Sequence, residues 1–134
     1  MSKDWVKDIN DMHRKFGVHE ALADFDKLKL KEYLEFRLRF LDEELNETKS
    51  AALLRDPEEV VDGLIDLCVV AIGTMDAFGI DAYKAWDAVH KANMAKEVGI
   101  NTSRKNDFNL PDLVKPEEWE NPSHEGNHGT LTDM

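Results

Sequence analysis

Apolar side chains recur at intervals of three and four along most of the chain, a spacing that places them on one face of an α-helix. This periodicity predicts helices over residues 2–16, 29–54, 57–78 and 82–98, and a connection containing a helical turn over 18–27. No stretch shows a convincing alternation of apolar and polar residues, so no β-strand is predicted. The pattern therefore predicts an all-α fold with four principal helices.

Two of these helices carry apolar stripes that identify candidate core faces. The stripe of the first helix is formed by Trp5, Ile9, Met12 and Phe16, with Ser2 as a candidate cap. The core stripe of the second helix is formed by Leu34, Leu38, Leu41 and Leu45. A neighbouring edge of the second helix carries Arg37, Phe40, Glu44 and Glu47. His13 and Arg14 lie off the first stripe and are expected to face solvent, whereas His19 is assigned no role.

The third helix, 57–78, has a clear start in the sequence. Asp56 suits the N-cap, Pro57 suits the first helical position, and Glu59 completes a capping-box pattern. The run 60–72 is apolar almost all round the helix, which predicts a helix packed on every side.

Acidic residues nevertheless interrupt this apolar run. Glu59, Asp62 and Asp66 fall on one face of a helix with about 3.6 residues per turn. Burying a carboxylate costs free energy unless it is paired or binds a cation. We therefore predict a function for the acids in the most apolar helix of the chain.

A second acidic cluster lies in the preceding helix. Glu44 and Glu47 are spaced i,i+3, and Glu43 and Glu47 are spaced i,i+4, so they share one helix surface. If the two helices pack antiparallel, the two clusters converge. Such oxygen ligands suit Mg2+, which takes waters and substrate phosphates as further ligands. The competing interpretation is an ordinary charged face, paired with Arg37 and Arg39.

Length, charge and cysteine content limit the class of protein. The 134 residues suit one domain over 1–134, with a helical body over 2–98 and an irregular C-terminal arm over 99–134. A net charge of −11 argues against nucleic acid as a partner, because phosphate backbones attract basic surfaces. The single Cys68 suits a reducing compartment. The N-terminus lacks an apolar signal core, and the run 60–72 is too short and too acidic to span a membrane. We expect a cytoplasmic protein with no membrane partner.

Polar residues near the end of the fourth helix are candidates for binding phosphate. Asn93 and Lys96 lie near its inward edge, and Lys96 can meet a phosphate as a point charge. The basic pair Arg104 and Lys105 follows the helix. Apolar residues beyond it are expected to attach the arm to the helical body, whereas the C-terminal end is expected to be mobile. These apolar residues are Phe108, Leu110, Leu113, Val114 and Trp119.

The acids are the main candidates for catalysis. The sequence contains no GxSxG elbow, no phosphate-cradling glycine loop and no CxxC pair. The remaining chemistry is metal-assisted, in which carboxylates hold Mg2+ and the ion bridges phosphate oxygens and helps to activate a water. A neighbouring carboxylate can act as general base. The doublet Glu43–Glu44 offers a base and a ligand side by side.

Two half-motifs resemble a known family. Glu44-Leu45-Asn46-Glu47 followed by Glu59-Val60-Val61-Asp62 resembles the ExxE…ExxD signature of the all-α nucleotide pyrophosphohydrolases. That group includes MazG-like enzymes, dimeric dUTPases, dCTP pyrophosphatases and phosphoribosyl-ATP pyrophosphohydrolases. The runs EEVVDGLIDLCVVAIGTMDAFGID and WDAVHKANMAKE are similar to the third and fourth helices of the family, and DLVKPEEW resembles an extension of its phage and bacterial members. The resemblance covers roughly residues 30–120 and implies a four-helix MazG-like bundle.

The resemblance also implies an activity and roles for single residues. It implies hydrolysis of a (d)NTP between the α and β phosphates, giving (d)NMP and pyrophosphate, with Mg2+ as cofactor and Mn2+ as a substitute. The implied metal ligands are Glu44, Glu47, Glu59 and Asp62. Glu43 would orient or deprotonate the attacking water. Asp66 would not bind the metal itself but would fix the geometry of the ligands. The implied contacts to the nucleotide are Asn93, Lys96 and Arg104. Members of the family assemble as homodimers or homotetramers.

Two other functions stay open on the sequence alone. One is phosphoribosyl-ATP hydrolysis, which has the same pyrophosphate chemistry and a different base pocket. The other is a non-catalytic helical interaction module, which would explain the acidity but not Asp62 and Asp66 inside an apolar run. A carboxylate-bridged di-iron bundle is disfavoured because Glu-x-x-His pairs are missing.

Overall fold

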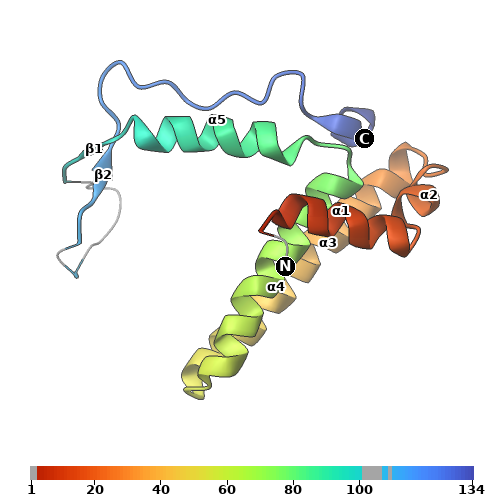
Figure 1. Cartoon of the computed structure of the whole chain (residues 1–134), viewed down its shortest axis with the longest axis horizontal. Coiled ribbons are helices and arrows are strands. Elements are labelled where there is room, and N and C mark those ends of the chain that lie inside the picture. The colour runs from red at the N-terminus through yellow and green to blue at the C-terminus, as the bar shows by residue number, and fades with distance from the viewer. Residues whose placement is uncertain (1–2, 101–106, 109) are drawn as a thin grey trace. The chain divides into compact units, whose positions relative to one another are not determined.

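The structure is a computed structural model that describes residues 3–100, 107–108 and 110–134. The prediction of an all-α fold is confirmed. In chain order the helices are α1 (Trp5–Lys15), α2 (Val18–Leu22), α3 (Lys27–Leu53), α4 (Pro57–Ala77) and α5 (Ala82–Met94), as Figure 1 shows. Three short elements follow, β1 (Glu97–Val98), β2 (Leu113–Val114) and the 3-10 helix η1 (Gly129–Asp133). The chain divides into two compact units, the first running up to Ala82 and including Gly126–Met134, the second comprising Tyr83–Glu125.

The first unit is built on a hairpin of α3 and α4, which lie side by side in Figure 1. The turn between them is short because one helix ends where the next is capped. Arg55 adopts a left-handed φ of 56°, and the N–H of Asp56 donates to the Ala51 carbonyl at 3.0 Å, closing the last turn of α3. The Asp56 carboxylate then accepts a hydrogen bond from the Glu59 N–H at 3.2 Å and caps α4, as predicted.

Gly63 and Gly73 let α3 and α4 approach closely, because a side chain at either position would clash with Thr48 or Arg37 of α3. Gly63 is buried, and a Cβ at this position would clash with the Thr48 hydroxyl and lie 3.1 Å from the Thr48 Cβ. One end of the hairpin is held by Arg37, whose guanidinium donates to the Thr74 hydroxyl at 3.0 Å and to the Val70 carbonyl at 2.9 Å. The edge of α3 that contacts α4 is therefore the mixed stripe that contains Arg37 and Glu44.

The predicted core stripe of α3 is only partly covered, since Leu34 and Leu41 are half-buried and the other two leucines are exposed. Leu38 and Leu45 are 51% and 41% exposed. The run in α4 is likewise not packed on every side, since Val61 and Leu64 remain 62% and 53% exposed. Both helices carry more apolar side chains than one copy of the chain buries. Periodicity alone therefore did not identify which of these side chains are buried.

The N-terminal helices pack against the C-terminal half of α4, and Figure 1 shows α1 lying across it. Ile9 of α1 is buried against α4, whereas Trp5 and Phe16 of the predicted stripe stay exposed. Asp4, not Ser2, caps α1 by accepting a hydrogen bond from the Lys7 N–H at 2.9 Å.

Phe78, at the end of α4, is the anchor for the C-terminal residues. It is 1% exposed and lies 5.9 Å from the Tyr33 ring. The Phe78 carbonyl accepts a hydrogen bond from the Thr130 N–H at 2.8 Å, and Asn127 exchanges two side-chain hydrogen bonds with the backbone of Asp81. The expectation of a mobile C-terminal end is wrong because these residues close over Phe78.

The second unit contains α5 and the segment that follows it. β1 and β2 form an antiparallel pair with Glu97 opposite Val114, which periodicity missed because each strand spans two residues. The predicted attachment of the arm through Trp119 is confirmed, since its indole N–H donates to the Ala92 carbonyl at 2.6 Å. Within the described part of the chain, no single helix is long and apolar enough to cross a bilayer, although α4 and α5 together pass the same test of length and composition.

Candidate active site

Carboxylates of α3 and α4 lie next to the contact between Thr48 and Gly63. Thr48 packs on Gly63, and the acids occupy the neighbouring positions on both helices. Glu47 precedes Thr48, Glu44 lies one turn before it, and Asp62 precedes Gly63. The Thr48 hydroxyl donates to the Glu44 carbonyl at 2.7 Å, which holds this threonine in the contact. An antiparallel pair joined at this point brings the two acidic clusters together.

The electrostatics of Glu44 report this convergence. Partial burial raises the pKa of the Glu44 carboxyl, and repulsion from neighbouring carboxylates raises it further. These neighbours, in decreasing order of effect, are Glu47, Asp66, Asp62 and Glu43. Acids from two helices therefore act on one carboxylate, a repulsion that a bound cation would relieve.

The acids differ in exposure. Glu44 and Asp66 are half-buried, whereas Glu43, Glu47 and Asp62 are exposed. Asp62 is thus more accessible than its place in an apolar run suggested, because α4 leaves that surface uncovered. The cluster is therefore open to solvent.

Glu59 stands one turn nearer the α3–α4 connection than Asp62 and is exposed. Its backbone N–H donates to the Asp56 carboxylate and so takes part in the cap. In a full capping box the Glu59 carboxylate would accept from the Asp56 N–H. Among the described residues, that N–H donates to the Ala51 carbonyl instead. The Glu59 side chain is therefore not committed to capping. It is not among the carboxylates that raise the pKa of Glu44.

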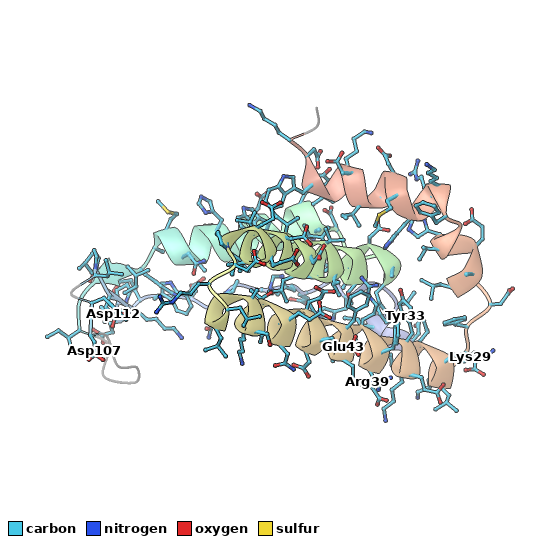
Figure 2. The ribbon with its side chains drawn as sticks, turned by 90° about the horizontal axis from the view of Figure 1, so that it is seen from below. Lys29, Tyr33, Arg39, Glu43, Asp107 and Asp112 are labelled. Atoms are coloured by element: carbon cyan, nitrogen blue, oxygen red, sulfur yellow. The ribbon has the colours of Figure 1, made fainter. Side chains whose placement is uncertain are left out.

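The predicted phosphate-binding residues lie outside the first unit. Asn93 is exposed on α5, and the half-buried Lys96 holds its ammonium 5.6 Å from the centre of the Trp119 ring. Arg104 lies outside the described residues. Figure 2 marks Glu43 on α3, with Arg39 one turn before it.

A second polar cluster was missed by sequence reasoning. His13, expected to be exposed, is buried, and its imidazole and that of His19 both bind Asp76 near the end of α4. Asn10 donates a hydrogen bond to the same carboxylate. The signal available in the sequence was weak: Asp76 is another acid in a mostly apolar helix, and both histidines precede α3 without an assigned role.

The carboxylate cluster fits a hard divalent cation by its donor set. All of its side-chain donors are carboxylate oxygens, which Mg2+ prefers, and the exposure of several leaves room for water and phosphate ligands. Of the residues proposed as ligands, Glu44, Glu47 and Asp62 share one electrostatic environment. Asp66 belongs to the same environment.

Comparison with known proteins identifies the family of the chain. The family model of phosphoribosyl-ATP pyrophosphohydrolase matches residues 11–93, more than half of the chain, and includes both acidic half-motifs. No significant match to a curated protein or to a solved structure was found. The match sets aside the non-catalytic interaction module, because members of the family are hydrolases acting on phosphoric anhydrides. The chain belongs to the phosphoribosyl-ATP pyrophosphohydrolase family, within the MazG-like all-α NTP pyrophosphohydrolases, and is a nucleotide pyrophosphohydrolase.

Proposed function

We propose that the protein hydrolyses a nucleoside triphosphate between its α and β phosphates, with Mg2+ as cofactor, giving a nucleoside monophosphate and pyrophosphate. The observation that carries this proposal is the cluster of carboxylates from α3 and α4 around Glu44. A bound cation would relieve their mutual repulsion and would offer a phosphate its counter-charge. The family match supports the reaction class.

Each acid has a proposed role in this reaction. When bound, Mg2+ neutralises charge that develops on the phosphates, and Mn2+ is expected to substitute. Glu44, Glu47, Glu59 and Asp62 hold the ion, and half-buried Asp66 orients the ligands from behind. Glu43 adjoins Glu44 and accepts the proton of the attacking water as one P–O anhydride bond breaks and pyrophosphate leaves.

Asn93, Lys96 and Arg104 are the residues proposed to contact the nucleotide. Asn93 is exposed and suits hydrogen bonding to the substrate. Lys96 and Arg104 are proposed to pair with its phosphates, and Lys96 would exchange its position over the Trp119 ring for a phosphate oxygen.

We also propose that the enzyme is a cytoplasmic homodimer or homotetramer. Exposed leucines on α3 and exposed apolar residues on α4 form surfaces that a second copy of the chain would cover. Cys68 is unpaired, which suits a reducing compartment.

Phosphoribosyl-ATP is the second candidate substrate, favoured by the description of the matching family. The same anhydride bond is cleaved, so the carboxylates would have the same roles. The two candidates differ in the part of the substrate beyond the phosphates.

Measurement of pyrophosphate release tests both candidates. The purified enzyme is incubated with a panel of canonical and modified NTPs and dNTPs, and separately with phosphoribosyl-ATP, with Mg2+ or with excess EDTA. Mg2+-dependent pyrophosphate together with a nucleoside monophosphate supports the first candidate. Release from phosphoribosyl-ATP alone moves the assignment to the second, and release unaffected by EDTA contradicts the metal-assisted mechanism.

A further inference from the structure

Side chains from three helices of the first unit come together near the end of α4. This cluster is remote from the acids around Glu44. His13 comes from α1, His19 from α2 and Asp76 from α4. Asp76 lies ten residues after Asp66, which is about 15 Å along a helix that rises about 1.5 Å per residue. The His13–His19–Asp76 cluster is therefore distinct from the proposed catalytic centre.

The geometry of the cluster is that of converging ligands. His13 Nδ1 and His19 Nε2 each lie 2.7 Å from Asp76 Oδ2, and one ligand atom from each of the three residues falls within 4.8 Å of the others. Ligand atoms about 2.0–2.2 Å from a common tetrahedral ion stand about 3.3 Å apart. In such a site each of the two nitrogen–oxygen distances would lengthen from 2.7 Å to about 3.3 Å.

The cluster is partly enclosed, and its carboxylate is positioned by a further side chain. The side chains of His13 and Asp76 are 7% and 11% exposed, whereas that of His19 is 36% exposed and leaves an approach from solvent. Asn10 Nδ2 donates to Asp76 Oδ1 at 2.7 Å, which leaves Oδ2 to the imidazoles. Gly73 lies against the His13 ring, since a Cβ there would stand 3.3 Å from Nε2.

The donor set selects a class of ion. Two imidazole nitrogens and one carboxylate oxygen suit borderline divalent ions such as Zn2+ and are unsuited to Mg2+, which takes oxygen ligands. A cavity of about 580 Å3 opens beside the cluster and is lined in part by Asn10, His19, Asp76 and Asp133. It has room for the water ligands that complete the coordination of a three-ligand site.

We propose that His13, His19 and Asp76 bind one Zn2+-class ion, which ties α1 and α2 to the end of α4. The alternative for the same atoms is a purely hydrogen-bonded junction in which each imidazole donates an N–H to Asp76. The two differ in one requirement: a metal ligand needs a free nitrogen lone pair, whereas the hydrogen-bonded junction needs an N–H donor.

The variant His19→Gln separates these two arrangements. Its side-chain amide keeps an N–H donor for Asp76 but is a poor ligand for Zn2+. His19 is the most exposed member of the cluster, so this variant is expected to fold even where a change at buried His13 would not. His90→Ala, which removes an exposed histidine of α5, is the matched control.

The test is a calorimetric titration of tag-free protein, stripped with EDTA and then freed of it, with Zn2+ as the only transition metal. The buffer contains excess Mg2+, which occupies the acidic cluster. We expect one Zn2+ per chain, a rise in the melting temperature, and visible absorption when Co2+ replaces Zn2+. His19→Gln should lose this binding, Asn10→Ala should weaken it about 10–100-fold, and His90→Ala should leave it unchanged.

Two results would overturn the proposal. The first is no saturable binding of Zn2+ to the wild-type protein, which would leave the hydrogen-bonded junction as the role of the cluster. The second is equal affinity in the wild type and in His19→Gln, which would place the ion elsewhere. Asp62→Asn should keep the Zn2+ site, so the outcome does not depend on the proposed catalytic function.

Discussion

Glu44 is the residue whose proposed role as a metal ligand has a cost in stability while no metal is bound. Its pKa is raised by partial burial and by repulsion from acids of both helices, so its ionised form is less stable in the folded protein than in the unfolded chain. A folded-state pKa above the unfolded value gives an acid an unfavourable contribution at neutral pH. That contribution disappears as the pH falls through the raised pKa and below the unfolded pKa.

The first prediction follows from this sign. In EDTA, Glu44→Gln should raise the urea midpoint at pH 7, and the difference from the wild type should shrink as the pH is lowered through the range in which glutamate protonates. With Mg2+ present, the wild type should gain stability that the variant lacks, because the variant has lost a ligand. A variant less stable than the wild type in EDTA at pH 7 would contradict the assigned repulsion.

The second prediction concerns the exposed ligands. Asp62→Asn and Glu47→Gln should each lower Mg2+-dependent pyrophosphate release by about 100-fold or more, since loss of outer partners alone weakens metal sites about 10–100-fold. Circular dichroism should show unchanged helix content, because both side chains are exposed. Asp42→Asn, an exposed acid of α3 outside the cluster, is the control and should retain activity. Normal turnover in both variants would exclude these residues as ligands.

Among the elements, the α3–α4 pair determines where the acids stand. Its register is set by close contacts at two places, Gly63 against Thr48 and Gly73 against Arg37. Gly63 and Thr48 each adjoin a proposed ligand in the sequence. The spacing between the helices and the geometry of the acidic cluster are therefore coupled.

The third prediction tests this coupling. Gly63→Ala places a Cβ against the Thr48 side chain and should lower the free energy of unfolding by about 1–3 kcal/mol, net of a helix-propensity gain of up to about 1 kcal/mol. It should also weaken stabilisation by Mg2+. The double variant with Thr48→Ala should recover much of both losses, and urea unfolding of the four proteins in a double-mutant cycle measures the coupling. If the effects of the two substitutions on the free energy of unfolding are additive, the added Cβ does not act through the Thr48 side chain and the prediction is wrong.

The helical fold class and the start of α4 were predictable from the sequence, whereas helix faces were not. The Asp56 cap and the helix over 57–78 depend on neighbouring residues, which the sequence displays directly. The buried face of α3 depends on what packs against it. Arg37 enters the contact through hydrogen bonds to α4, and Thr48 enters it by packing on Gly63, neither of which hydrophobic periodicity registers. His13 was missed for the same reason, because its partner Asp76 lies 63 residues away.

At the scale of the whole molecule, the apolar surface of the hairpin is the main feature. Leu38 and Leu45 lie two turns apart on α3 and are both about half exposed. Exposed apolar side chains in a row are typical of a surface that another chain covers.

The fourth prediction is that this row lies in a subunit interface. The wild type should elute as a dimer or tetramer in size-exclusion chromatography with light scattering, and Leu38→Lys combined with Leu45→Lys should shift it toward monomer. Leu53→Lys, at an 85% exposed position at the end of α3, is the matched control and should keep the wild-type mass. A monomeric wild type would contradict the proposed assembly.

The return of the C-terminal residues to Phe78 gives the chain an unusual connectivity. Residues of the first unit precede and follow the second unit in the sequence, so the second unit is joined to it through two covalent connections. A single proteolytic cut within the second unit would leave each of its halves bonded to the first. The protein would then remain associated after nicking, and its fragments would separate only on denaturation.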